Sequence, residues 1–342
     1  MSSNQYLIDA TTRHSVFLQR YAGGEAKKAV KTLNRIRREI NARLSQEPTL
    51  FQRNRLLAVL EDIDSIYTSG YATIEQDVIR GVFALAEQEA GFSTKLYNIA
   101  TEANFVLPSE SSLMQAVELA PMAVPKDVGL TIDAALTEYG DKKIEQIKQA
   151  ITDGVVLGDT TPEISAKVGN IMTTLHRRQL ETLVRTTTNH TSSVARQETF
   201  KQNEDILEGY RWIATLDNRT TLICMSRDQQ KLRIGIDPMP PAHWGCRSTT
   251  IPIVKDEYNL GSGITGQRAS KGAKGGETVS ANLSYGGWLK TQPSAFVDEA
   301  LGVERSRLFR SGKLTIDKFV DPTGRVFTIQ ELENQNPFIF ME

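Results

Sequence analysis

The sequence predicts an α+β protein with a mainly α-helical N-terminal region, a small β-containing module and an irregular C-terminal tail. Apolar residues recur at helical spacing through most of residues 27–202. Residues 210–254 instead contain short alternating runs, which have the period of half-buried strands. Beyond residue 254 glycine is frequent and no long periodic run remains.

The length of 342 residues is enough for two or three domains. We expect five segments along the chain. They are an N-terminal helical hairpin or bundle (1–106), a linker with helices (107–174), a core module with a long helix and a small β-sheet (175–254), a Gly-rich linker (255–283), and a tail with short helices and a hairpin (284–342).

Amphipathic stretches predict the helices of the N-terminal half. They cover residues 27–45, 51–67, 72–103, 112–119, 131–157, 160–172 and 175–202. Breaks are predicted at Gly23-Gly24, Pro48, Ser69-Gly70 and the prolines Pro108, Pro121 and Pro125. Thr160, Pro162 and Glu163 give a strong helix start, because a Thr cap, an early Pro and an early Glu occur together.

Shorter elements are predicted in the second half. Strands are expected over 210–216 and 249–254, and a strand–turn–strand hairpin at Phe319-Val320 and Val326-Phe327. Gly261-Ser262-Gly263 and the glycines that follow predict a flexible linker. Short helices are expected over 295–301 and 329–334.

The net charge of −1 conceals two blocks of opposite sign. Residues 1–55 carry a balance of +7 and residues 56–165 a balance of −12, which predicts surfaces that dock on charged partners or solvated helix faces. A DNA-binding surface within residues 13–55 is one alternative, and its candidate contacts are Lys27, Lys28, Lys31, Arg35 and Arg38. No apolar run approaches the ~18 residues of a membrane helix, and two cysteines suit a reducing cytoplasm.

Cys224, His243 and Cys246 have the spacing of metal ligands. Structural zinc requires four N or S ligands, and only three are offered, with Asp217 or Asp228 as a weak fourth. Buried thiols beside a hydrogen-bonded histidine, or a disulfide formed after lysis, are the alternatives. We therefore expect no metal and no cofactor, with zinc at these three residues as the alternative.

A catalytic interpretation uses the same stretch. Asp217, Asp228 and His243 would hold a divalent ion in a metal-dependent nuclease or hydrolase, and Ser226, His243 and Asp217 would form a triad. The sequence contains no Walker A motif, G-x-G-x-x-G or H-E-x-x-H. We expect no catalytic residues, and interpret Asp217 as the fixed residue of an Asx-type turn.

Motifs between residues 185 and 249 then occur in a recognisable order. Arg185-Thr-Thr on the long helix is followed by a Trp strand, an Asp-x-Arg turn, a Cys and a Pro-Pro-x-His-x-x-Cys-Arg segment. In these features, over about residues 175–254, the sequence resembles the phage Mu F-like head morphogenesis family, also called minor capsid or minor head proteins. The module-defining residues are Arg185, Trp212, Asp217, Arg219, Cys224, Pro241, His243, Cys246 and Arg247.

The resemblance implies a structural protein of the phage virion or procapsid, assembled in the host cytoplasm. It implies a place near the portal, a role in head morphogenesis and in DNA packaging or ejection, and several copies per particle. The implied partners are the portal protein, the major capsid or scaffolding protein, and double-stranded DNA, with no membrane span. Many relatives carry cysteines at the positions of Thr221 and Ser248, and the lack of these cysteines argues further against a metal.

Overall fold

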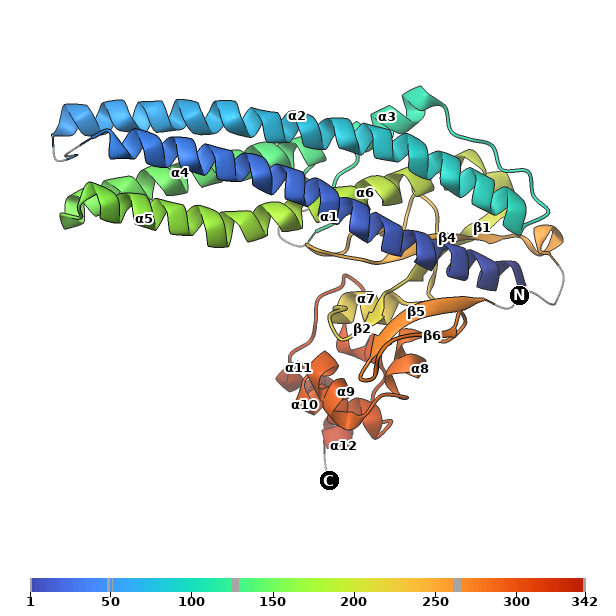
Figure 1. The fold of residues 1–342 in the computed structure, drawn as a ribbon. Helices are drawn as coiled ribbons and strands as arrows, with labels where there is room; N and C mark the ends of the chain where they lie inside the picture. The colour runs from blue at the N-terminus through green and yellow to red at the C-terminus, as the bar shows by residue number, and fades with distance from the viewer. Residues whose placement is uncertain (1, 48–49, 51, 125–128, 261–265, 341–342) are drawn as a thin grey trace.

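The computed structural model describes residues 2–47, 50, 52–124, 129–260 and 266–340. A long helical bundle forms one part of the molecule, and strands and short helices pack beneath one end of it (Figure 1). The predicted α+β class is confirmed. No helix in the described ranges is long and apolar enough to cross a membrane.

Two long helices, α1 (Ser2–Ser45) and α2 (Arg53–Ala100), dominate the bundle. The breaks predicted at Gly23-Gly24 and Ser69-Gly70 are wrong, because both pairs lie inside these helices. A Cβ on Gly70 would lie 2.5 Å from Ile36 Cγ1, so glycine lets the two helices approach closely there. Packing of this kind outweighs the cost of about 1 kcal/mol for a helical glycine. The stop predicted at Pro48 and the predicted helix start at Phe51 lie outside the described residues.

The other helices of the N-terminal half lie close to their predicted bounds. They are α3 (Glu110–Leu119), α4 (Ile132–Leu157), α5 (Thr161–Ile171) and α6 (Arg177–Gln202). Thr160 forms the predicted capping box with Glu163 at the start of α5. A π-helical turn, Met172–His176, joins α5 to α6. The two helices predicted over 160–172 and 175–202 are therefore joined without a break. Pro125 lies outside the described residues.

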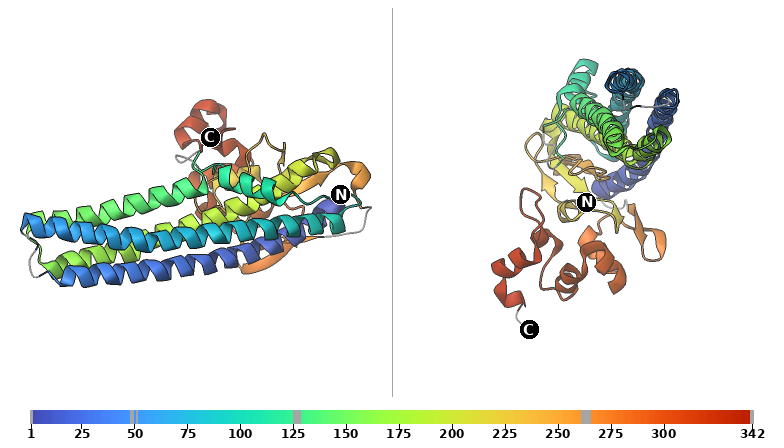
Figure 2. Two further views of the ribbon diagram at one scale, coloured as in Figure 1. Left: turned by 90° about the horizontal axis from the view of Figure 1, so that it is seen from above. Right: turned by 90° about the vertical axis from the view of Figure 1, so that its left-hand side faces the viewer.

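The end of the bundle away from the strands consists of α1, α2, α4 and α5, which the right-hand view of Figure 2 shows end-on. A continuous apolar core joins them, with Ile36, Ile63 and Ile147 fully buried. The helix α6 contributes Leu180, Val184 and Ala195 to this core and runs toward the strands (Figure 1). A second apolar cluster includes Leu7 of α1, Tyr97 of α2 and Phe200 of α6, and it also contains Ile251 and Tyr210 from the first sheet.

Two three-stranded sheets follow α6. The first has the antiparallel order β3-β1-β4, with β1 at Leu207–Ile213, β3 at Lys231–Leu232 and β4 at Thr249–Val254. The second has the order β2-β5-β6, with β2 at Leu216–Asp217, β5 at Gln267–Gly272 and β6 at Gly275–Ser280. Short 3₁₀ turns flank these strands at Glu204–Ile206 and Asp256–Tyr258.

The prediction of a flexible Gly-rich linker over residues 255–283 is wrong for most of the residues that the structure describes there. Strands β5 and β6 form an antiparallel hairpin there, and Gly275, with a φ of +105°, permits its tight turn. The glycines that predicted flexibility therefore include one that builds this turn. Gly261-Ser262-Gly263 lie outside the described residues.

The predicted irregular tail folds into a third apolar core. Its helices are α8 (Tyr285–Leu289), α9 (Ser294–Leu301), α10 (Val303–Arg310), α11 (Ile329–Gln335) and α12 (Pro337–Phe340), with a 3₁₀ turn at Ile316–Phe319. Trp288 and Phe319 of the tail pack in one cluster with Trp212 of β1 and with α7 (Leu222–Arg227). The predicted hairpin is reduced to an antiparallel bridge between Val320 and Val326.

Candidate functional site

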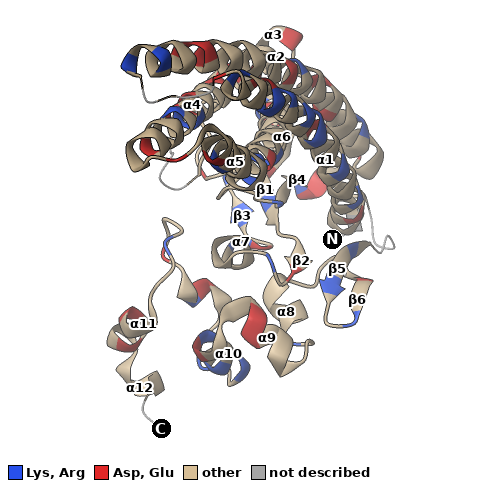
Figure 3. Cartoon of the chain, turned by 60° about the vertical axis from the view of Figure 1, so that its left-hand side comes forward, with Lys and Arg blue, Asp and Glu red and all other residues tan. Residues whose placement is uncertain are grey.

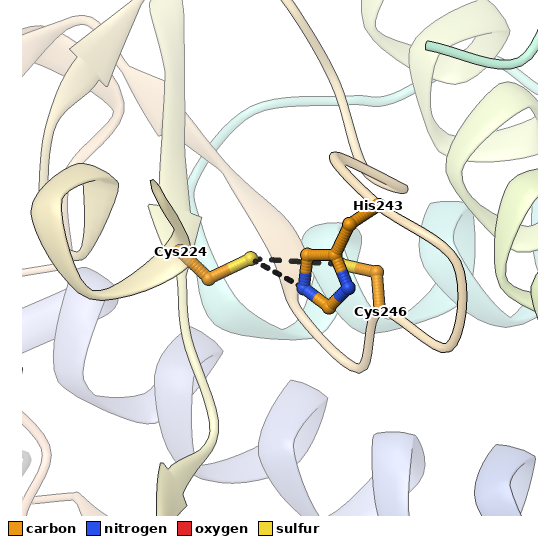
Figure 4. A group of neighbouring side chains, drawn as sticks. All are labelled: Cys224, His243 and Cys246. Atoms are coloured by element: carbon orange, nitrogen blue, oxygen red, sulfur yellow. Dashed lines mark hydrogen bonds between the residues drawn. The ribbon is translucent and has the colours of Figure 1, made fainter. Parts of the chain in front are cut away.

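Cys224, His243 and Cys246 come together in the structure (Figure 4). Cys224 lies on α7, whereas His243 and Cys246 lie on the loop that leads into β4. The Cys224 sulfur is 3.3 Å from His243 Nε2 and 3.7 Å from the Cys246 sulfur. Both cysteines are free, and they are only 1% and 2% exposed.

The loop that carries His243 and Cys246 is held against α6. Its Gly245 has a φ of +74°, a conformation that favours glycine, and its backbone N–H donates to the Thr186 hydroxyl at 2.9 Å. Asn189 donates to the Cys246 carbonyl at 3.0 Å. The predicted module residue Pro241 follows a cis peptide bond in the same loop. These contacts place both loop side chains opposite Cys224.

The three side chains shift one another's protonation. Burial alone would raise the pKa of Cys246, but its contacts with Cys224 and His243 hold that pKa well below its ordinary value. The hydrogen bond to Cys246, together with burial, raises the pKa of Cys224. Burial lowers the pKa of His243, yet the neighbouring Cys246 raises it by more. The cluster therefore favours one thiolate beside an imidazolium and a thiol.

Thr221 and Ser248 border the same cluster. Their hydroxyl groups lie beside the Cys224 thiol. They lower its pKa, but Cys246 and burial raise it by more. The Thr221 hydroxyl has no other hydrogen-bond partner among the described residues. At these two positions the chain lacks cysteines that many members of the family it resembles carry. Both positions lie beside the same cluster.

Asp217 is a structural residue of the adjoining turn. Arg247 binds both of its carboxylate oxygens, one of them at 2.8 Å. The backbone N–H of Arg219 donates to it at 3.1 Å, as the predicted Asx-type turn requires. Burial would raise the pKa of Asp217, but the Arg247 guanidinium holds it below its usual value. The Arg219 side chain is 74% exposed.

Asp228 joins the two sheets and the tail. It forms a fully buried ion pair with Arg268 of β5 at 3.0 Å. Its carboxylate also accepts from the backbone N–H groups of Ala214 and Tyr285, both at 2.7 Å. Arg268 was missed in the sequence, because a single arginine in a Gly-rich polar stretch gives no sign that it is buried.

A similar buried pair crosses the bundle. Arg196 of α6 binds Glu89 of α2 at 2.9 Å, and both side chains are 1% exposed. Burial would raise the pKa of Glu89, but Arg196 and His14 hold it below its ordinary value. Arg185 instead donates to the Gln19 carbonyl of α1 at 3.4 Å. Trp212 and Trp288 are also fully buried.

The proposed hydrolase centre is not assembled. Asp217 and Asp228 are occupied by arginines, and within the described ranges the one group of three or more metal-ligating side chains is the Cys–His–Cys cluster. The Ser226 hydroxyl donates to the Ile223 carbonyl, and His243 Nδ1 contacts the Trp244 carbonyl at 3.0 Å, so the triad is also absent. The carboxylates that suggested catalysis instead hold strands together.

The candidate DNA contacts lie on α1, outside this module. Lys27, Lys28, Lys31, Arg35 and Arg38 are all exposed. Figure 3 shows basic residues along this helix. Two acidic neighbours moderate the charge, since Glu25 pairs with Lys28 at 2.7 Å and Glu39 lies 3.9 Å from Arg35.

Residues 145–251 match the family model described as Phage Mu protein F like protein. No curated protein and no solved structure matches the chain. The matched region runs from the middle of α4 into β4, and it contains the Cys–His–Cys cluster and both Asp217 and Asp228. This family consists of structural phage proteins. The similarity suggests a role in head morphogenesis as a minor capsid protein and a place in the virion, and it does not suggest catalysis. The match confirms the resemblance to the phage Mu F-like family, over residues 145–251 of the chain.

Proposed function

We propose that the protein is a non-enzymatic minor component of the procapsid or virion that acts near the portal and contacts packaged DNA through α1. The observation that carries the DNA contact is the row of exposed basic side chains on α1. Three arginines outside α1 have internal partners instead. Arg196, Arg247 and Arg268 all pair with buried carboxylates. The surface for an anionic partner is therefore on the bundle.

The geometry of α1 suits a linear polyanion. Lys27, Lys31, Arg35 and Arg38 follow the i, i+4, i+8, i+11 spacing of one helix face. This row spans ~17 Å at 1.5 Å per residue. Double-stranded DNA carries about one charge per 1.7 Å of its axis, so the row lies beside several phosphates at once. The contact requires no base-specific geometry, which suits packaged DNA of any sequence.

The DNA contact is tested by the salt dependence of binding to a DNA duplex. For the double variant K27A/K31A we expect weaker binding, and a slope of log K against log salt that is smaller by about 1.8, since each lost phosphate contact removes about 0.9. The matched control is K271A/K274A, which removes two exposed lysines from the β5–β6 hairpin. A wild-type affinity insensitive to salt, or equal effects of both double variants, would remove DNA as the partner of α1.

The place in the particle is tested separately. Cross-linking of purified procapsids and virions, followed by mass spectrometry, should join lysines of α1 or the tail to the portal, capsid or scaffolding protein. Quantification of the same peptides gives the copy number, which we expect to exceed one per particle. Absence of the chain from both kinds of particle would contradict a structural role, whatever the DNA-binding result.

A further inference from the structure

The Cys–His–Cys cluster has no role in the proposed function, although its arrangement is specific. Two sulfurs and one imidazole nitrogen, from segments 22 residues apart, lie within 4.8 Å of one another. Both sulfurs are buried, and His243 is partly exposed. A purely hydrophobic role for the cysteines would not require an imidazole nitrogen directed at them.

Two of the three separations are close to those imposed by a tetrahedral zinc ion, and the third, between the Cys246 sulfur and the His243 nitrogen, lies within 4.8 Å. With Zn–S bonds of about 2.3 Å, two thiolates on one zinc lie about 3.8 Å apart, and a thiolate and an imidazole nitrogen about 3.6 Å apart. The structure has 3.7 Å between the sulfurs and 3.3 Å between the Cys224 sulfur and His243 Nε2. A disulfide would need sulfurs about 2.05 Å apart. The side chains therefore need only small adjustments to bind an ion, and a larger one to form a disulfide.

The surroundings orient the ligands. His243 Nδ1 donates to the Trp244 carbonyl at 3.0 Å in the tautomer that leaves Nε2 free to coordinate, as in many zinc sites. The loop is fixed on α6 through Thr186 and Asn189, so Cys246 is positioned before any ion binds. The Thr221 hydroxyl, which borders Cys224, supplies an oxygen at the edge of the cluster.

We propose that Cys224, Cys246 and Nε2 of His243 bind one zinc ion, with an oxygen donor, water or the Thr221 hydroxyl, in the fourth position. Thiolate and imidazole ligands in a tetrahedral arrangement select zinc over magnesium or calcium. Binding displaces to solvent any protons that the two sulfurs and Nε2 of His243 carry, and leaves both sulfurs as thiolates. The ion would link α7, and with it the core of the tail, to the loop anchored on α6. This inference is independent of the DNA contact and of the place in the particle.

The first test is the metal content of the full-length protein, purified under reducing conditions and measured by elemental mass spectrometry. We expect about one zinc per chain. The variants C224S, C246S and H243A should lose it, whereas S226A, on the same helix but with its hydroxyl bonded to the Ile223 carbonyl, should retain it. Zinc that remains bound at the same level in all three ligand variants would overturn the proposal.

A second test does not depend on the variants folding. Cobalt is added to metal-free wild-type protein, and thiolate-to-cobalt charge-transfer absorption with strong tetrahedral d–d bands is expected at one equivalent. Competition by zinc should abolish both. Wild-type protein with two titratable thiols and no cobalt absorption would overturn the proposal. Recovery of a Cys224–Cys246 disulfide from cells lysed in a thiol-blocking reagent would overturn it in favour of a redox-active pair.

Discussion

At the scale of single residues, buried ion pairs connect parts of the chain that are distant in sequence. Asp228 and Arg268 are 1% and 0% exposed, and the carboxylate also accepts two backbone N–H groups. A buried charge is tolerated only when its partner and its hydrogen bonds are complete. Asp228 therefore holds the end of β1, β5 and α8 together.

Replacement of Asp228 by Asn should strongly destabilise the protein. The amide keeps the shape of the carboxylate but leaves the Arg268 guanidinium buried without its counter-charge, and loss of one partner of a buried pair costs about 3–5 kcal/mol. The matched control is D237N, which breaks the surface pair of Asp237 with Arg233 and should change stability little. Urea unfolding of both variants measures the difference. Equal midpoints would contradict the buried pair.

His190 should make stability depend on pH. It lies buried in α6 with Nε2 at 3.0 Å from the Ala120 carbonyl, and burial lowers its pKa to about 4. The unfolded state, with a pKa near 6.5, binds a proton first, so stability is complete above about pH 6.5 and falls as the pH drops toward 4. The substitution H190Q keeps a donor for Ala120 and should reduce the slope of the stability profile in this window, while His176, whose pKa burial also lowers to about 4, keeps its own contribution. A profile with the wild-type slope would show that other groups cause it.

At the scale of elements, local sequence signals located helix ends better than helix interruptions. The Thr160 capping box was readable because all of its groups lie within four residues. Gly23-Gly24 and Ser69-Gly70 were misread as breaks because the sequence does not show that Gly23 lies against Arg185 of α6 and Gly70 against Ile36 of α1. The β5–β6 hairpin was missed for a related reason, since its polar, Gly-rich strands owe their pairing to neighbours in space.

The candidate site was also only partly predictable from the sequence. The spacing of His243 and Cys246 identified two members of the cluster, because a turn brings them together locally, with the Cys246 N–H donating to the His243 carbonyl. Neither the distance from Cys224 nor the pairing of Asp217 and Asp228 with arginines could be read from the sequence. These contacts depend on how α7 and β5 fold back on the module.

Gly70 gives a test of helix packing. In G70A the new methyl group would lie 2.5 Å from Ile36 Cγ1, so the variant should lose about 1–3 kcal/mol of stability although Ala favours helices. Gly91 on the same helix has no neighbour within 4 Å of an added Cβ, so G91A should gain up to about 1 kcal/mol. Opposite signs are the expected result in thermal or urea unfolding. A gain in both variants would mean that α1 and α2 are not in close contact at Gly70.

At the scale of the whole molecule, the bundle and the tail have separate apolar cores, and the Cys–His–Cys cluster lies where they meet. Cys224 and Cys246 both belong to the core of the tail, whereas Trp244, next to His243, packs against the core of the bundle. An ion at this position would stabilise the edge of the tail core and its contact with the loop that is anchored on α6.

Metal removal should therefore act locally. An ion that binds only the folded state adds RT ln(1 + [L]/Kd) to stability, about 2.7 kcal/mol when the free ion is at 100 times Kd. With a chelator, hydrogen exchange should accelerate in α7 and in residues 242–248, whereas amides of α1 and α2 at Ile36 and Ile63 should keep their protection. The variant S226A should respond as the wild type does, and C246S should exchange rapidly with or without chelator. Equal acceleration throughout the bundle would show that the ion stabilises the whole fold, and no acceleration would show that the contact between the two parts does not depend on it.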